Sequence, residues 1–468
     1  GWSRGLKNID EPAIRDWYVD VNDNIGAEAD IFRPKYKGNN NFFPECYIIP
    51  LDGKNQSNIE AAYDMQEFLL NNGVKVHKLN TAVTFNGKTY PKGSMVVSMY
   101  QAKRNVANGA LYDGILITGW PDLYSEPITA FGDMRGFDYA AVDKKGLVKE
   151  SMLDEIKEPQ KAKTVFTGKK NKEVIVDNNS VSAIALINQL LSDGIKVGFI
   201  TEGDYKGDFV VAYSNFKEYQ DKFIVKATGV DSVSGARIIN KPSVYVPGYS
   251  GQYSVNSEGK EYGVLNYPNY GNTNYNFDVY AYGKQMGFSL TDNVKEANII
   301  AGNRALNDEE VKAVKEGKSY LAAGVGSLEK LKTDVLGQYG FDYVSTGTNQ
   351  DALYKVTFDT DSIITAGNVK NKDNIVYSYG GAYISGVPEN AQILMTATKD
   401  TPLEGFMIQE NLEKFLGGIQ AFSYNENGID VTVFAGSLTN KAHQQDEYQF
   451  AANTIFSKVL GEDYNSAN

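Results

Sequence analysis

The first strong pattern of apolar positions along the chain predicts a strand, a helix and a second strand. Residues 46–50 form a short apolar run that is typical of a buried strand. Residues 58–71 carry apolar side chains three and four positions apart, as one face of a helix requires, and Gly73 follows where a helix C-terminus favours glycine. Residues 74–79 then alternate apolar and polar side chains. This order predicts a β-α-β unit.

A later stretch of the chain repeats this pattern. Residues 190–197 read Leu-Leu-Ser-Asp-Gly-Ile-Lys-Val and match residues 69–76, which read Leu-Leu-Asn-Asn-Gly-Val-Lys-Val. Downstream, residues 207–212 match residues 93–98, because both begin with glycine and contain a Val-Val pair. The two matches in the same order indicate a second β-α-β unit related to the first.

The repeat suggests how the chain is divided into domains. The first copy is longer, and Asn86 with Gly87 predicts the turn of an inserted hairpin, since this pair favours a two-residue hairpin loop. We expect residues 43–240 to hold two related α/β units, at about 43–150 and 151–240. Residues 1–42 carry no sustained periodicity and are expected to be a linker remnant.

The third region, residues 241–468, first alternates strands with helices and is then richer in strands. A predicted strand at 319–323 leads into the glycine-rich turn Gly324-Val325-Gly326-Ser327, and a closing helix is expected at about 444–460. The carboxyl edge of a parallel sheet is the expected place for such a turn. The fold class predicted for the chain is multi-domain α/β, with three-layer units and mostly parallel sheets.

Length and charge narrow the class of protein. The 468 residues correspond to about three domains at ~150 residues each, and a hydrophobic content of 42% supports packed cores. Lys and Arg number 46 against 58 Asp and Glu, a net charge of −12, so the chain lacks the basic character of a nucleic-acid-binding protein. Its apolar runs are too short to cross a bilayer. We expect no nucleic-acid partner and no membrane span.

Cysteine and histidine are too rare for most metal sites. Cys46 is the single cysteine, which excludes an intrachain disulfide and a thiolate zinc site, and a buried structural thiol is its favoured role. The two histidines, His77 and His443, fall in different predicted domains, and of these only His443 has a carboxylate three positions later, at Asp446. We therefore expect no zinc and no other cofactor in this chain.

The turn at Ser327 leaves a catalytic alternative open. Ser327 follows a predicted strand and precedes a predicted helix, as the nucleophile of an α/β hydrolase does, and His443 is the histidine of the same region. The residue two positions after Ser327 is Glu329, where that motif has glycine. A turn without catalytic role is the favoured interpretation. A hydrolase or amidotransferase that uses Ser327 and His443 is the alternative.

Aromatic side chains supply candidate binding residues. Tyrosines alternate with asparagines and glycines over residues 262–275, and Trp120 follows a predicted strand at 114–118. Aromatic rings stack on sugars or peptides while amides form hydrogen bonds, so this composition suits a binding loop. A loop packed on its own domain and a free-standing carbohydrate- or peptide-binding module are both compatible with it. The candidate binding residues are Trp120, Tyr262, Tyr267, Tyr270 and Tyr275.

Three groups of segments carry a further similarity. They are Trp2-Ser3-Arg4-Gly5-Leu6-Lys7-Asn8 leading to residues 43–50; residues 93–101 with 112–121; and residues 403–406, 416–418, 431–436 and 449–460. Together they resemble the region that follows the catalytic domain in large bacterial secreted zinc carboxypeptidases. In those proteins the last part is similar to a class I glutamine amidotransferase-like domain that has lost its catalytic cysteine.

This resemblance implies that a catalytic domain carrying zinc precedes Gly1 in the same polypeptide, as a partner of this chain. It also implies an extracellular or bacterial cell-surface location. None of the family's zinc ligands, nor its substrate arginine or general-base glutamate, maps onto this sequence. The leading interpretation is therefore a non-catalytic accessory region that engages a substrate, a peptide or a cell-wall glycan, or acts as a scaffold.

Overall fold

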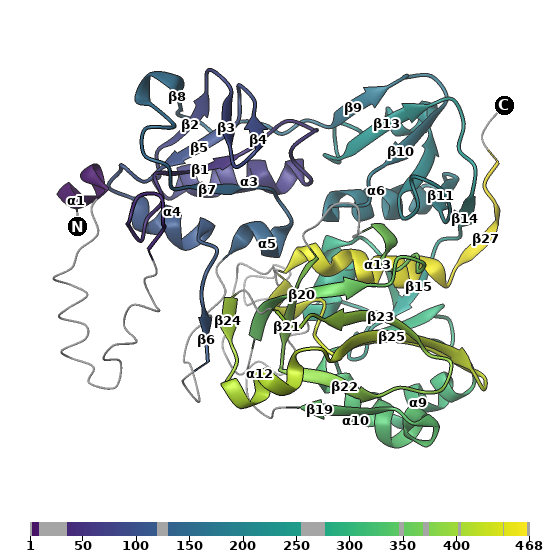
Figure 1. Cartoon of the computed structure of the whole chain (residues 1–468). Helices are drawn as coiled ribbons and strands as arrows, with labels where there is room; N and C mark the ends of the chain where they lie inside the picture. Colours follow the sequence, from purple (N-terminus) through teal and green to yellow (C-terminus); the bar gives the residue numbers. More distant parts are fainter. Residues whose placement is uncertain are drawn as a thin grey trace. The chain divides into compact units, whose positions relative to one another are not determined.

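The chain folds into mixed α/β structure with several sheets, as a computed structural model shows (Figure 1). The structure describes residues 2–8, 35–118, 130–253, 277–345, 351–367, 374–400, 404–442 and 444–465. Two compact units are present: Gly1–Ile115 with Thr129–Val165, and Leu116–Ile128 with Phe166–Asn468. Among the described residues, no helix is both long and apolar enough to cross a membrane.

The first unit is built on a five-stranded sheet in the order β7-β1-β5-β2-β8. Helix α3 connects β1 to β2 and turns a row of apolar residues into the core, as its periodicity predicts. The strand β5 lies between β1 and β2 and is antiparallel to both. Its elements are α1(Trp2–Lys7), β1(Cys46–Ile49), α3(Ile59–Asn71), β2(Val76–Leu79), β3(Val83–Phe85), β4(Lys88–Tyr90), β5(Met95–Ser98), α4(Arg104–Leu111), α5(Phe131–Arg135), β7(Ala140–Val142), a 3₁₀ turn (Glu150–Met152) and β8(Leu153–Ile156).

The predicted hairpin insertion is present. Strands β3 and β4 pair antiparallel, and Asn86 and Gly87 between them both have positive φ, at 48° and 77°. Positive φ at both central residues is the mark of the tight hairpin turn that this residue pair favours.

A seven-stranded sheet in the second unit has the same core topology. Its order, β27-β14-β11-β12-β10-β13-β9, contains β13-β10-β12-β11-β14, the counterpart of β7-β1-β5-β2-β8. Its elements are β9(Val165–Gly168), β10(Glu173–Val176), α6(Val181–Ser192), β11(Val197–Ile200), β12(Phe209–Ala212), α7(Tyr213–Phe216), β13(Lys226–Val230), β14(Ala236–Ile239) and β27(Leu460–Asp463).

The sequence repeat corresponds to this repeated topology residue by residue. Gly73 and Gly194 both end the connecting helix with φ of 73°. Val97 pairs with Tyr47 on β1, and at the same register Val211 pairs with Val174 on β10. The matched segments therefore occupy equivalent positions in the two sheets.

One expectation about these halves needs correction. The sheets were expected to be mostly parallel, but β1 and β10 are antiparallel to both of their neighbours. The reason is that β5 and β12 lie between the two strands that each β-α-β segment joins. Strand β8 pairs with β2 and completes the first sheet. Strand β27 pairs with β14, so the second sheet also contains a strand from the third region.

The third region forms most of a thirteen-stranded sheet. One half of it, β16-β15-β17-β18-β26, is parallel, and the other half, β25-β23-β20-β24, is antiparallel apart from a short parallel pair with β6. Its elements are β6(Leu116–Ile117), β15(Ser243–Tyr245), α8(Phe277–Val279), a π-helical turn (Tyr280–Gln285), β16(Ser289–Thr291), β17(Ile299–Gly302), α9(Asp308–Lys315), β18(Ser319–Ala323), α10(Val325–Lys330), β19(Asp342–Ser345), β20(Asp351–Phe358), β21(Ile375–Tyr379), β22(Ala382–Gly386), β23(Gln392–Ala397), β24(Glu404–Phe406), α12(Gln409–Phe415), β25(Ile419–Glu426), β26(Ile429–Phe434) and α13(Tyr448–Ser457).

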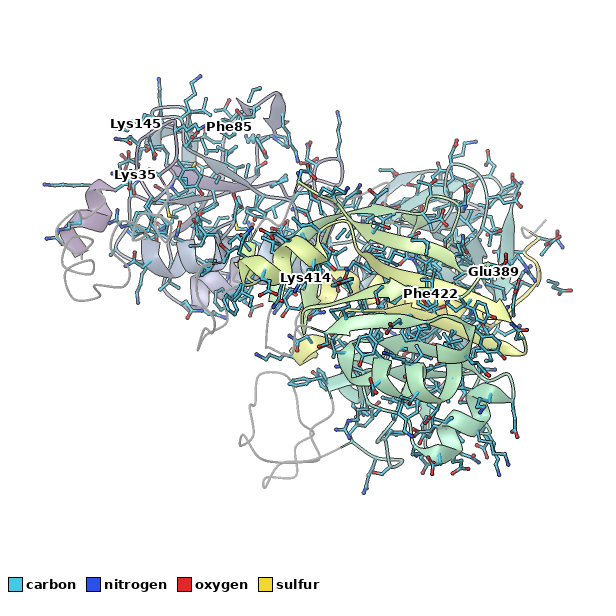
Figure 2. All side chains as sticks on the ribbon, turned by 60° about the horizontal axis from the view of Figure 1, so that its bottom comes forward. Lys35, Phe85, Lys145, Glu389, Lys414 and Phe422 are labelled. Atoms are coloured by element: carbon cyan, nitrogen blue, oxygen red, sulfur yellow. The ribbon has the colours of Figure 1, made fainter. Side chains whose placement is uncertain are left out.

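Helices cover both faces of the parallel half. On β18, Leu321 and Ala323 belong to the core that contains α13 and α6, whereas Tyr320 and Ala322 belong to the core that contains α9 and α10. This period of two is what a strand buried on both faces requires. Figure 2 shows Phe422, which is fully buried on β25, among these packed side chains.

The end of the chain is anchored on the second sheet by Tyr464. Its hydroxyl donates to the buried carboxylate of Glu173, at 2.8 Å, and the ring packs over Gly198. A Cβ atom on Gly198 would lie 2.9 Å from the ring. Glycine at this position therefore leaves the space that the ring fills, and the contact holds β27 beside β14.

Candidate functional site

The parallel half of the large sheet has a point at which successive strands are added on opposite sides. Strand β16 pairs with one edge of β15, and β17 pairs with the other. The helical segment after β15 packs in one core and α9 packs in the other, so the crossovers leave the sheet on opposite faces. Ligands of open α/β sheets bind beyond the carboxyl ends of the strands at such a point.

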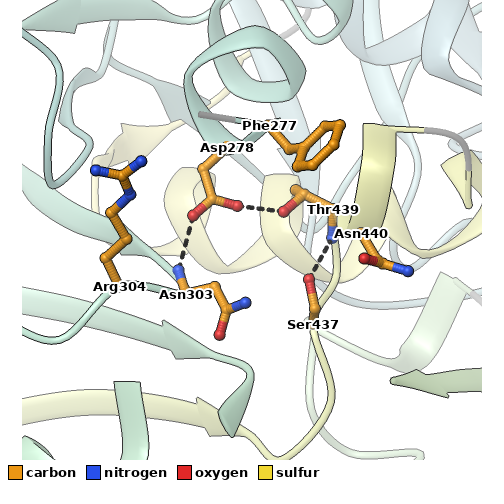
Figure 3. Close-up of a pocket in the computed structure, with 7 residues that line it drawn as sticks. All are labelled: Phe277, Asp278, Asn303, Arg304, Ser437, Thr439 and Asn440. Atoms are coloured by element: carbon orange, nitrogen blue, oxygen red, sulfur yellow. Dashed lines mark hydrogen bonds between the residues drawn. The ribbon is translucent and has the colours of Figure 1, made fainter. Parts of the chain in front are cut away.

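A hollow of about 120 Å³ lies at this carboxyl edge (Figure 3). It is formed by the start of α8, the loop after β17 and the loop after β26. It is lined by one aromatic residue, Phe277, and by residues with polar side chains, which are Asp278, Asn303, Arg304, Ser437, Thr439 and Asn440.

Asp278 joins the three segments of the hollow. The backbone N–H of Asn303 donates to one carboxylate oxygen at 2.8 Å, and the Thr439 hydroxyl donates to the other oxygen. Burial raises the pKa of Asp278, while the two hydrogen bonds and the nearby Arg304 guanidinium act in the opposite direction. Because both oxygens already accept hydrogen bonds, Asp278 organises the site.

The glycine-rich turn after β18 lies next to the hollow and is filled by Asn303. The backbone N–H of Gly326 donates to Oδ1 of Asn303 at 3.1 Å. A Cβ atom on Gly324 would lie 2.3 Å from the same oxygen, and one on Gly326 would lie 2.2 Å from the Asn303 carbonyl oxygen. Gly324 also has φ of 112°, a conformation that favours glycine. Both glycines are thus required by the close approach of Asn303.

Ser327 is not presented as a nucleophile. Its side chain is fully buried, and its hydroxyl donates to the carbonyl oxygen of Gly324 at 2.7 Å. Val325, the second residue of the turn and the first of α10, is half-buried and has no reactive atom. His443 lies outside the described residues, so the expected separation of Ser327 from His443 stays a prediction.

The predicted aromatic binding residues also lie outside the described part of the chain. They are Trp120, Tyr262, Tyr267, Tyr270 and Tyr275. Cys46 is buried on β1, where burial raises the pKa of its thiol to about 12. His77 is half-buried on β2 in the first unit, and burial lowers its pKa. Within the described ranges, no group of three or more His, Cys, Asp and Glu residues is arranged to hold a metal ion.

Sequence reasoning did not single out the residues of the hollow. Asn303 directly follows strand β17, which the apolar run at 298–301 predicts, so its place at a carboxyl edge was accessible from the sequence. Asp278 and Thr439 left no such signal, because they are 161 residues apart and meet only in the folded chain.

No protein-family model and no curated protein matches the sequence. Among solved structures, the exo-β-1,4-mannosidase Op5Man5 from Opitutaceae bacterium strain TAV5 aligns at 13% identity and TM-score 0.26, over 47% of this chain and 36% of the mannosidase. A cytoplasmic protein from Salmonella typhimurium aligns at 9% identity and TM-score 0.27, over 46% of this chain and 98% of that protein. A β-galactosidase from Bacillus circulans sp. alkalophilus aligns at 8% identity and TM-score 0.27, over 53% and 34%. The chain spans about a third of the length of the two glycosidases, and TM-scores of this size give no indication of its function.

Proposed function

We propose that this chain is a non-catalytic accessory region whose last domain engages a ligand at the carboxyl edge of its parallel sheet. The observation that carries the proposal is the turn after β18, where Ser327 is buried and hydrogen-bonded, Val325 has no reactive atom, and Asn303 lies against Gly324 and Gly326. A site of this kind binds its ligand and does not catalyse a reaction of it.

The oxyanion position of the turn is blocked as well. In α/β hydrolases the backbone N–H of the residue after the nucleophile stabilises the oxyanion. With Val325 in the nucleophile position, that donor is the Gly326 N–H, and it already donates to Asn303. Both requirements for acyl transfer, a nucleophile and a free donor, are therefore absent at this described turn.

The larger context of the proposal comes from the resemblance in sequence. We propose a parent protein similar to a bacterial secreted zinc carboxypeptidase, in which zinc and catalysis belong to a preceding domain, with substrate or cell-wall engagement or scaffolding left to this chain. The parallel sheet, the helices on both of its faces and the turn at the end of β18 support a class I glutamine amidotransferase-like layout for the last domain.

Covalent probes test the non-catalytic assignment. The wild-type chain should not be labelled by a fluorophosphonate, because Ser327 is buried and hydrogen-bonded. It should also resist iodoacetamide, because Cys46 is buried with a raised pKa. Val325→Cys should be alkylated once per chain by iodoacetamide yet should not hydrolyse thioesters or activated esters, because Asn303 still occupies the Gly326 donor.

The hydrolase alternative predicts that the fluorophosphonate labels Ser327. Stoichiometric labelling of Ser327 by the fluorophosphonate in the wild-type chain, abolished by His443→Ala, would overturn the proposal. Failure of Val325→Cys to react, with the protein folded, would show that the turn is less accessible than its half-buried residue indicates.

A further inference from the structure

Three side chains of the hollow, Asn303, Ser437 and Asn440, keep hydrogen-bonding groups that no described residue uses. Each of the three is fixed by one bond: Oδ1 of Asn303 accepts from Gly326, Oγ of Ser437 accepts from the Thr439 N–H, and Nδ2 of Asn440 donates to Tyr377. The Nδ2 group of Asn303 and the Ser437 O–H remain as donors, and Oδ1 of Asn440 remains as an acceptor. Figure 3 shows these side chains around one open space.

The charge of the hollow is balanced before any ligand binds. The lining has one acidic side chain, Asp278, and one basic side chain, Arg304. Burial raises the pKa of Asp278, and the guanidinium of Arg304 acts in the opposite direction. An anionic ligand would be placed beside the Asp278 carboxylate, and a cationic ligand beside Arg304. Like charges at close range repel in a partly buried site, so each of these ligands would be repelled by one side chain of the lining. A neutral ligand avoids both repulsions.

Size and the remaining lining restrict the ligand further. A volume of about 120 Å³ is well below the ~300–1,000 Å³ of sites that enclose drug-sized molecules, so the hollow accepts one small group. Phe277 adds a half-buried aromatic ring beside the polar groups. An aromatic face next to fixed donors and acceptors suits a ligand with an apolar ring face and a polar edge.

We propose that the hollow binds a neutral polyhydroxylated group, with its hydroxyls against Asn303, Ser437 and Asn440 and its ring face against Phe277. A hydroxyl both donates and accepts, so it satisfies a lining in which unused donors and acceptors are mixed. The terminal residue of a glycan and a free sugar share this chemistry. The inference rests on the proposed function, because it names the ligand of the same carboxyl edge.

Titration of the full chain with D-glucose, cellobiose, D-sorbitol and D-glucuronate, followed by saturation-transfer NMR and calorimetry, tests the inference. We expect weak binding of the neutral sugars, with Ser437→Ala and Phe277→Leu each weakening it about fivefold or more. The control Ser214→Ala, an exposed serine on α7 in the same compact unit, should leave the affinity unchanged. The thermal midpoint of each variant shows that it is folded, and Phe277→Leu keeps the test valid if Ser437→Ala is not.

The results of these titrations distinguish a glycan end from a free sugar. They also distinguish failure of this inference from failure of the non-catalytic assignment. Tighter binding of cellobiose than of glucose points to a glycan end, and equal binding of the two points to a free sugar. Sorbitol has no ring, so binding of sorbitol as tight as that of glucose would overturn the contact between a ring face and Phe277. No binding of any neutral compound, or glucuronate binding more than tenfold tighter than glucose, would overturn the inference while leaving the non-catalytic assignment in place. Turnover of cellobiose would instead overturn the non-catalytic assignment.

Discussion

Replacing Tyr464 with phenylalanine should release the end of the chain from the second sheet. The substitution removes a hydrogen bond of 2.8 Å between the Tyr464 hydroxyl and Glu173, where Tyr464 is 5% exposed and Glu173 is fully buried. The ring and its packing over Gly198 are kept. A hydrogen bond to a charged group contributes about 1.5–3 kcal/mol, so we expect the free energy of local opening of β27 to fall by that amount.

Native-state hydrogen exchange measures this opening directly. The amides of β27 should exchange about ten- to a hundredfold faster in Tyr464→Phe, since each 1.4 kcal/mol corresponds to a factor of ten. Tyr219→Phe is the matched control: the Tyr219 hydroxyl donates to Asp193 at 2.7 Å, but Asp193 is exposed and water replaces the lost partner. If Tyr219→Phe lowered the free energy of local opening around Tyr219 as much as Tyr464→Phe lowers that of β27, the reasoning would be refuted. The length of the hydrogen bond, rather than its burial, would then determine how much it stabilises the fold.

The same pair predicts a dependence on pH. Burial, and then Glu173, raise the pKa of Tyr464 well above its usual range. Above pH ~10 the unfolded chain loses the phenolic proton while the folded chain keeps it, so stability is complete below that pH and falls as the pH rises. Tyr464→Phe should remove this part of the alkaline slope in urea unfolding, and an unchanged slope would contradict it.

Three further substitutions test other parts of the structure. Because burial raises the pKa of Asp278, its contribution to stability is complete below pH ~3.9 and is lost as the pH rises through the folded pKa. Asp278→Asn should therefore reduce the fall of the free energy of unfolding, measured in urea, between pH 3 and 7, and an equal fall in both proteins would count against the assignment. Asp430→Asn should lower the free energy of unfolding by about 1–3 kcal/mol, because the carboxylate accepts from Lys458 and Ser319 in a mostly buried position; a thermal midpoint within error of wild type would disprove it. Gly87→Ala should cost about 1–2 kcal/mol, because φ is 77° although a Cβ atom would meet nothing within 4 Å; no loss of stability would mean that the hairpin turn changes its conformation freely.

The sequence predicted the local elements of the fold better than their pairing. Helix α3 was predicted from its apolar spacing, and its end was predicted from Gly73, which has φ of 73° in the structure. Both features depend only on neighbouring residues. Strand β5 lies between β1 and β2 because of contacts between distant residues, and nothing in the apolar pattern of a strand specifies its direction or partner. The expectation of parallel sheets failed for this reason in the two related halves.

The candidate site shows the same division. The turn Gly324–Ser327 could be placed at the end of a strand, because both the strand and the glycines are local features. Its occupation by Asn303 could not be foreseen, since the glycines of a turn that encloses a side chain look the same in sequence as those of a catalytic turn. Composition favoured the tyrosine-rich segment as a binding site, and that segment lies outside the described residues. The described hollow is lined by hydroxyl, amide, charged and aromatic side chains that composition did not single out.

The pairing of β27 with β14 also has a consequence for biosynthesis. Ile239 pairs with Leu460, so after Ile239 the ribosome adds 460 − 239 = 221 residues up to and including its partner. At ~5–20 residues per second, this takes about 10–45 s, during which β14 has one open edge and the notch over Gly198 is empty. An exposed strand edge invites pairing with other nascent chains. Slow translation of the third region should therefore increase the capture of this intermediate by chaperones, while codon changes within the first unit should not.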